Sequence, residues 1–135
     1  MIRHIDLNIP GQGLHMFTRE IEALVEHSGI REGLCSLLVQ HTSASLLIQE
    51  NADPSARRDL ENWLNRLVVE NDPLYTHTLE GADDMPAHIK SALTATTLSI
   101  PIENGALALG TWQGVYLWEH RRMRGSRRVV VHLGD

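Results

Sequence analysis

The sequence has one cysteine, one lysine and no long hydrophobic run. A single cysteine, Cys35, excludes an internal disulfide, and its apolar neighbours indicate a small buried side chain rather than a nucleophile. The apolar runs are far shorter than the roughly 20 residues of a membrane helix, and the first residues lack the layout of a signal peptide. We therefore expect a cytoplasmic protein that neither spans nor binds a membrane.

Positive charge is also scarce. The chain has 12 basic and 17 acidic residues, and its net charge of −5 argues against nucleic acid as a general partner. The charges are unevenly placed, because residues 50–84 are rich in carboxylates whereas residues 121–128 hold five arginines and no acid. The guanidinium group suits phosphate recognition, although a charged, solvated hairpin is the simpler interpretation of residues 121–128.

The composition otherwise describes an ordinary globular chain. Hydrophobic residues make up 42 % and charged residues 21 % of the 135 positions. A chain of this length buries enough surface for a core without disulfides or a structural metal. We expect one domain over residues 1–135.

Apolar periodicity predicts both helices and strands. Residues 5–9 alternate as in a strand, and helical spacing follows over about 16–28, with Ser28-Gly29 as the expected C-terminal cap. The apolar runs 33–40 and 44–49 are consistent with one long strand bent between them. Asp53-Pro54 starts a second helix, because aspartate caps helices and proline fits the first turn. Its expected buried stripe is Leu60, Trp63, Leu64, Leu67 and Val68.

The second half of the chain contains a long loop, a third helix and further strands. Residues 70–84 are polar and irregular, and a loop of this length in a compact domain suggests a functional role. A short helix then starts at Asp84. Asn104-Gly105 between apolar runs is a strong hairpin signal. Together these elements predict an α+β domain with two or three helices and largely antiparallel sheets.

Four polar segments are candidates for chemistry. His41-Thr42-Ser43 interrupts apolar runs, and such groups are costly to bury unless each finds a partner or a ligand. Asp84 and His88 are four residues apart on one helix face, the spacing of a carboxylate that orients an imidazole for acid–base work or metal binding. The other two segments are 50–53, with Asn51, and 110–114, where a core position for Trp112 is favoured.

These four segments resemble the YjbQ family in order and spacing. The matching residues are His41-Thr42-Ser43-Ala44-Ser45, Glu50 to Pro54, Glu80 to Lys90, Gly110 to Gly114 and Glu119-His120-Arg121. Members of this family are described as secondary thiamine-phosphate synthases. The resemblance implies a β-sandwich-like α+β fold, a homotrimer, and a pocket at or near subunit contacts. It also implies a weak or accessory synthase activity on small phosphorylated metabolites.

The resemblance places the catalytic residues at His41, Asn51, Asp84 and His88. The expected substrate-binding residues are Thr42, Ser43, Thr111, Trp112, Gln113, Glu119 and Arg127. In the mechanism we expect, His88 is oriented by Asp84 and protonates the leaving diphosphate, while Trp112 stacks on the pyrimidine that Asn51 fixes. Arginines of the 121–128 hairpin, backbone amides near residues 42–43, and Mg²⁺ or another divalent metal would hold the phosphates.

Two other functions remain open on the sequence. His41, His88 and a carboxylate, Glu119 or Asp84, could form the divalent-metal site of a hydrolase that acts on another small substrate. The identity of such a metal is not encoded in these residue types. Alternatively, the pocket of a trimer binds a small phosphorylated metabolite without turnover.

Overall fold

The computed structural model describes all 135 residues and contains three helices and two antiparallel sheets. The helices are α1 (Thr18–Ser28), α2 (Pro54–Leu67) and α3 (Asp84–Leu93). The strands are β1 (Ile2–Ile9), β2 (Gly13–Met16), β3 (Gly33–Val39), β4 (Ala44–Glu50), β5 (Thr97–Glu103), β6 (Ala106–Leu107), β7 (Gln113–Glu119) and β8 (Gly125–Gly134). The predicted α+β class is confirmed. No helix is both long enough and apolar enough to cross a membrane.

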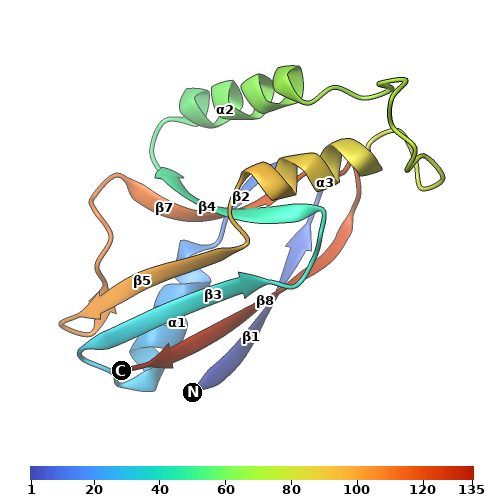
Figure 1. Cartoon of the computed structure of the whole chain (residues 1–135). Helices are drawn as coiled ribbons and strands as arrows, with labels where there is room; N and C mark the ends of the chain where they lie inside the picture. Colours follow the sequence, from blue (N-terminus) through green and yellow to red (C-terminus); the bar gives the residue numbers. More distant parts are fainter.

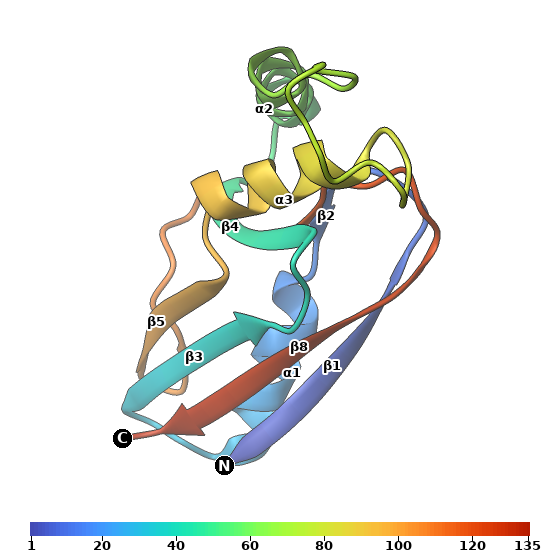
Figure 2. The same cartoon turned by 45° about the vertical axis from the view of Figure 1, so that its right-hand side comes forward.

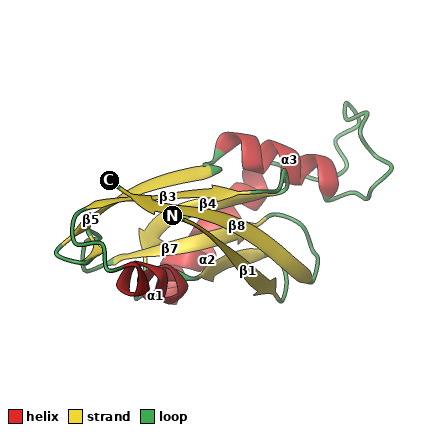
Figure 3. Ribbon diagram, turned by 90° about the horizontal axis from the view of Figure 1, so that it is seen from below, coloured by secondary structure: helices red, strands yellow, loops and turns green.

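The two sheets form layers. Strands β1-β8-β3-β5-β6 make the five-stranded sheet, and β2-β7-β4 make the three-stranded sheet. Figure 1 shows the three-stranded sheet between the larger sheet below and helices α2 and α3 above, with both chain termini on the larger sheet. Seen from below, α1 lies beside the strands, on the side away from α3 (Figure 3).

The main core lies between the two sheets and α1. Ile21 and Val25 of α1 are buried in one apolar cluster that also holds Leu46 of β4, Leu117 of β7 and Val131 of β8. A second, smaller apolar cluster covers the opposite face of the three-stranded sheet, beneath α2 and α3 (Figure 2). The three-stranded sheet is therefore buried on both faces, so its polar side chains must find partners inside the protein.

The local signals in the sequence are borne out. Asp53 caps α2 with its side chain, which accepts a hydrogen bond from the Ser55 amide at 2.9 Å. Gly29 ends α1 in the left-handed conformation. Asn104 and Gly105 both have positive φ, 53° and 81°, as the predicted tight hairpin requires.

Two expectations about the elements are wrong. The runs 33–40 and 44–49 are two strands in different sheets rather than one bent strand, because residues 40–43 carry the chain from β3 to β4. On α2, Leu64 and Val68 are buried, but Trp63 and Leu67 are 54 % and 56 % exposed. The helix contacts the sheet along a narrower stripe than its sequence predicts, which leaves an apolar strip uncovered.

Candidate functional site

The predicted pairing of Asp84 with His88 is confirmed. Asp84 is the first residue of α3, and His88 follows one turn later on the same face. The Oδ2 atom of Asp84 lies 3.1 Å from Nε2 of His88. The aspartate side chain is 4 % exposed and the histidine side chain 31 % exposed, so a buried carboxylate holds an accessible imidazole.

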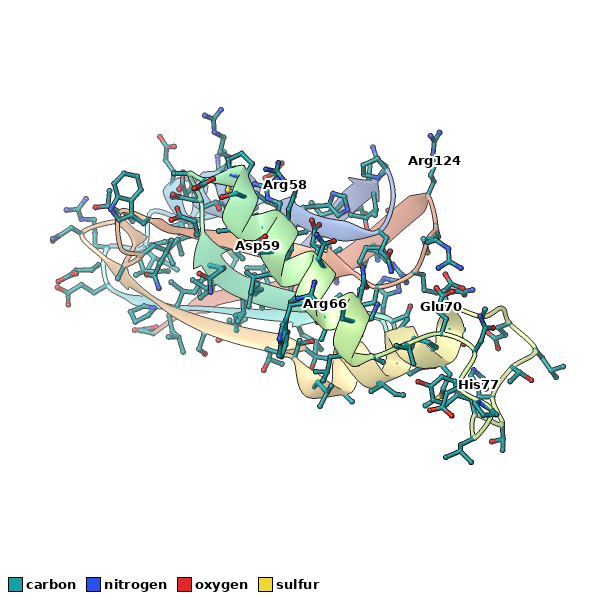
Figure 4. The ribbon with its side chains drawn as sticks, turned by 90° about the horizontal axis from the view of Figure 1, so that it is seen from above. Arg58, Asp59, Arg66, Glu70, His77 and Arg124 are labelled. Atoms are coloured by element: carbon teal, nitrogen blue, oxygen red, sulfur yellow. The ribbon has the colours of Figure 1, made fainter.

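A second histidine, His77, contacts the same carboxylate oxygen. Its Nε2 atom lies 2.7 Å from Oδ2 of Asp84, and the two imidazole rings are 5.2 Å apart. His77 lies on the loop between α2 and α3 (Figure 4) and is 44 % exposed. We call His77, Asp84 and His88 the histidine–aspartate centre. The length of this loop predicted a functional role for it. Because the segment has no periodic pattern, the sequence did not indicate which of its side chains would reach Asp84.

Arg121 occupies the other oxygen of Asp84. Its Nη1 atom lies 3.3 Å from Oδ1, and Nη2 donates to the Glu80 carbonyl and to Asp83. Burial alone would raise the pKa of Asp84, but the hydrogen bonds from the two histidines and the positive charges of His88 and Arg121 outweigh it. The pKa of Asp84 therefore lies below its usual 3.8, and the carboxylate is ionised at neutral pH.

The second ring nitrogen of His88 determines its protonation. Nδ1 lies 3.1 Å from the carbonyl oxygen of Thr42, which can only accept a hydrogen bond. Nδ1 therefore carries a proton. In a neutral ring, Nε2 would then present a lone pair to the Asp84 carboxylate, which is repulsive. A proton or another cation between Nε2 and Oδ2 relieves this repulsion.

His41 does not join this centre. Its Nε2 atom accepts a hydrogen bond from the Arg128 amide at 3.0 Å, which requires a lone pair on that nitrogen. Burial lowers the pKa of His41, and the positive charge of Arg127 lowers it further. His41 is thus a neutral acceptor that ties residues 40–43 to β8, and no hydrogen bond links it to His88.

Glu119 and Arg127 form a buried pair. Arg127 donates from Nε and Nη2 to the two carboxylate oxygens of Glu119, and from Nη2 to the hydroxyl of Ser43 at 2.9 Å. Nearby, His120 is hydrogen-bonded through Nε2 to the hydroxyl of Ser45 at 2.8 Å. We call these five residues the Glu119 network. All five are buried, so the structure uses Ser43, Glu119 and Arg127 on each other.

The arginine hairpin is largely paired with acids rather than open to phosphate. Arg121 and Arg122 contact acids around the 70–84 loop, and Arg128 binds Asp6 at 2.8 Å. With Arg127 buried, Arg124 is the arginine of this hairpin without an ion pair. In Figure 4 it projects away from His77, on the other side of Glu70.

The remaining predicted residues form a separate group, the Asn51 cluster. The Asn51 side chain donates to the carbonyls of Thr111 and Gln113 at 3.1 and 3.2 Å, and its amide donates to the Trp112 carbonyl. Trp112 is 65 % exposed, so the core position expected for it is wrong. A surface cavity of about 350 Å³ is lined by Asn51, Thr111 and Gln113.

The two groups lie at opposite ends of β4. Residues 42–43 precede this strand and Asn51 follows it. Eight residue steps at about 3.3 Å each separate the ends by roughly 25 Å. Within this chain, the structure therefore divides the expected pocket into two sites.

Comparison with known proteins identifies relatives along the whole chain. A family model described as UPF0047 protein YjbQ-like matches residues 3–135. The UPF0047 protein sll1880 of Synechocystis sp. is 57 % identical over 91 % of this chain and 84 % of its own. The UPF0047 protein YjbQ of Escherichia coli O157:H7 is 45 % identical over 96 % of this chain and 94 % of its own.

A solved structure has the same fold. The conserved hypothetical protein TT1486 from Thermus thermophilus superimposes with a TM-score of 0.87 at 36 % identity, covering 98 % of this chain and 99 % of that one. These descriptions name no activity. The similarity thus establishes family and fold.

Proposed function

The chain belongs to the UPF0047 family of YjbQ-like proteins, and on this premise we propose that it is a secondary thiamine-phosphate synthase. The reaction joins hydroxymethylpyrimidine diphosphate to thiazole phosphate. The observation that carries the proposal is the double hydrogen bond of His88, from Nδ1 to the Thr42 carbonyl and from Nε2 to Asp84. This arrangement orients an accessible imidazole between a main-chain acceptor and a carboxylate, as a general acid requires.

The proton on Nε2 of His88 has a defined use in this reaction. The bond between the pyrimidine methylene carbon and the diphosphate oxygen breaks, and its electron pair goes to the oxygen. His88 donates its Nε2 proton to that oxygen while the thiazole nitrogen forms the new bond to carbon. Asp84 holds the imidazole in place before the transfer and compensates its charge.

Arg121 supports the same step by positioning Asp84. It is 26 % exposed and is the hairpin arginine in contact with the centre, so its charge also favours a departing anion. The Mg²⁺ of the expected mechanism does not fit here, because Mg²⁺ prefers oxygen ligands and the centre offers two nitrogens and one carboxylate. We assign Mg²⁺ no residue of this chain.

The Asn51 cluster fits the pyrimidine half of the substrate. Both hydrogens of the Asn51 amide are used on carbonyls, which leaves Oδ1 free to accept from an amino group on the pyrimidine. Trp112 exposes a flat ring next to it, suited to stacking. Because this cluster lies roughly 25 Å from His88, we propose that one site combines His88 of one subunit with Asn51 of another.

Exposed apolar side chains support assembly into the proposed trimer. Trp63 and Leu67 of α2 are uncovered, and Leu74 and Leu79 on the following loop are 85 % and 98 % exposed. A groove of about 590 Å³ runs along α2 beside Trp63, lined also by Asp59 and Arg66, which Figure 4 labels. Surfaces of this kind are typical of protein contacts.

Single-turnover formation of thiamine phosphate tests the acid role. The protein and its His88→Ala variant are purified from a host without its own synthase, and His27→Ala on α1 is the matched control. We expect product from the parent and the control, and about a 100-fold slower reaction in His88→Ala. Equal rates in all three would refute the role of His88. Ligand-induced thermal stabilisation without product would instead identify a binding protein.

Mixed oligomers test the shared site. His88→Ala and Asn51→Ala subunits are each expected to be inactive alone. After the two are unfolded and refolded together, random assembly should restore about a quarter of the parental sites, because each site then needs one intact residue from each of two neighbours. No recovery on mixing, from two folded and inactive variants, would place both residues in the same subunit's site.

A further inference from the structure

We propose that His77, Asp84 and His88 also form a binding site for one divalent transition-metal ion of the zinc type. The ligands are Nε2 of each histidine and Oδ2 of Asp84. These donor atoms come from α3 and from the loop that precedes it, and all lie within 4.8 Å of one another. The site follows from this geometry, and it holds or fails independently of the synthase proposal.

The distances are close to those of a formed metal site. Ligand bonds of about 2.0–2.2 Å in tetrahedral geometry place neighbouring donors about 3.3 Å apart. The carboxylate oxygen is 2.7 Å from His77 and 3.1 Å from His88. Reaching this spacing means lengthening the His77 contact by about 0.6 Å and the His88 contact by about 0.2 Å. The loop that carries His77 is exposed and free of regular structure, so it can adjust.

The ligand side chains are oriented by neighbouring groups, as is usual in metal sites. The Thr42 carbonyl accepts from Nδ1 of His88, which leaves the Nε2 lone pair for an ion. Arg121 occupies Oδ1 of Asp84, so Oδ2 is the oxygen available for binding. A cation at this position also removes the repulsion between the Nε2 lone pair of a neutral His88 and the carboxylate.

The donor set determines which ions fit. Two imidazoles and one carboxylate suit Zn²⁺, Co²⁺, Mn²⁺ or Fe²⁺, whereas Mg²⁺ and Ca²⁺ prefer oxygen donors. The histidines are 44 % and 31 % exposed, so solvent reaches the remaining coordination position. This ligand set replaces the one expected from the sequence, because His41 and Glu119 are engaged elsewhere.

A bound metal ion and a proton cannot occupy Nε2 of His88 at the same time. An ion on Nε2 of His88 displaces the proton that the synthase reaction needs. The loaded and protonated forms are therefore mutually exclusive, and the loaded form also fixes the 70–84 loop to α3 through His77.

Co²⁺ titration of untagged protein tests the site. Visible absorption reports Co²⁺ in a low-coordinate environment, and Zn²⁺ competition measures the affinity of the preferred ion. We expect one ion per chain, with affinity at least about 100-fold weaker in His77→Ala, His88→Ala and Asp84→Asn. His27→Ala, which removes an exposed histidine on α1, should bind as the parent does.

The His77→Ala variant makes the test decisive. His77 is exposed and on a loop, so this variant should remain folded. Binding as tight as the parent's in a folded His77→Ala protein, or no absorption band in the parent, would overturn the proposal. Metal binding is measured without the transfer assay, so loss of the metal site and loss of the synthase are observed separately.

Discussion

Two groups of polar side chains arise from the same short segments and have opposite surroundings. The histidine–aspartate centre uses the Thr42 carbonyl and Arg121, whereas the Glu119 network uses the adjacent Ser43 and His120. In the centre, a buried carboxylate holds imidazoles that solvent reaches. In the network, every group is buried and bonded to another member.

The two carboxylates Asp84 and Glu119 differ in the chemistry that their partners allow. A carboxylate paired bidentately with arginine inside the protein has both oxygens engaged, as Glu119 does with Arg127. Asp84 instead meets imidazoles, which can exchange a proton or bind an ion. Both carboxylates lie in motifs that match the family. They differ in the side chains that bind them and in the access of solvent to those side chains.

Removal of the buried arginine should give the largest effect. Arg127→Met leaves the Glu119 charge buried without a partner, which we expect to cost about 3–5 kcal/mol of unfolding free energy. Arg124→Met on the exposed hairpin should cost less than about 0.5 kcal/mol. Urea denaturation measures both. A Glu119→Gln/Arg127→Met protein should recover part of the loss, and a loss no larger than that of Arg124→Met would show that the network is dispensable.

The role of the Asp84 carboxylate is tested by the transfer rate of the Asp84→Asn variant. An asparagine cannot compensate the charge of the His88 imidazolium, so single-turnover transfer should slow by about 10–100-fold, less than in His88→Ala. Asp59→Asn, an exposed change on α2, serves as the control. A rate equal to the control's would mean that His88 acts without Asp84.

The buried His120 of the network should make the folded protein less stable in acid. Burial lowers the pKa of His120 to about 3, and the positive charges of Lys90 and Arg127 lower it further. Between pH 6.5 and 3 the unfolded chain binds a proton that the folded chain does not, so stability falls as the pH falls. The loss is about 1.4 kcal/mol per pH unit, or about 2 kcal/mol from pH 6.5 to 5.

His120→Gln keeps a hydrogen-bonding group beside Ser45 and removes this titration. Urea denaturation at pH 6.5 and pH 5 should therefore show a smaller loss in the variant than in the parent. Asp84 does not obscure the result, because its lowered pKa confines its contribution to the range below pH 3.8. An equal pH dependence in both proteins would mean that His120 takes up a proton while folded.

The smallest effect on transfer is expected for His77→Ala. Its Nε2 shares the Asp84 oxygen, but the Thr42 carbonyl positions only His88. Without added metal, the single-turnover rate should change by less than about threefold, well below the change expected from removal of a general acid. A loss comparable to that of His88→Ala would assign the acid role to both histidines.

Local signals account for the parts of the fold that the sequence predicts. Capping by Asp53, the left-handed Gly29 and the Asn104-Gly105 turn each depend on a few adjacent residues. The partition of β3 and β4 into different sheets depends on pairing with β8 and β7, far along the chain. Strand length and apolar content are the same in either arrangement, so the sequence pattern does not decide between them.

In the candidate site, too, the contact between neighbouring residues was predictable and the contacts between distant segments were not. Asp84 and His88 meet through helical spacing, which is a local rule. His77 reaches them only through the path of the loop, and Glu119 finds Arg127 only because β7 and β8 come together in the fold. The exposure of Trp112 likewise depends on what the rest of the chain leaves uncovered.

The acceptor that orients His88 belongs to the main chain. Because the Thr42 carbonyl is present whatever residue stands at position 42, no single substitution there deletes this hydrogen bond. Position 42 is also exposed, so many side chains fit. Sequence drift at this position is therefore compatible with an unchanged ring orientation, whereas an insertion or deletion in residues 40–43 would shift the carbonyl and dismantle the centre.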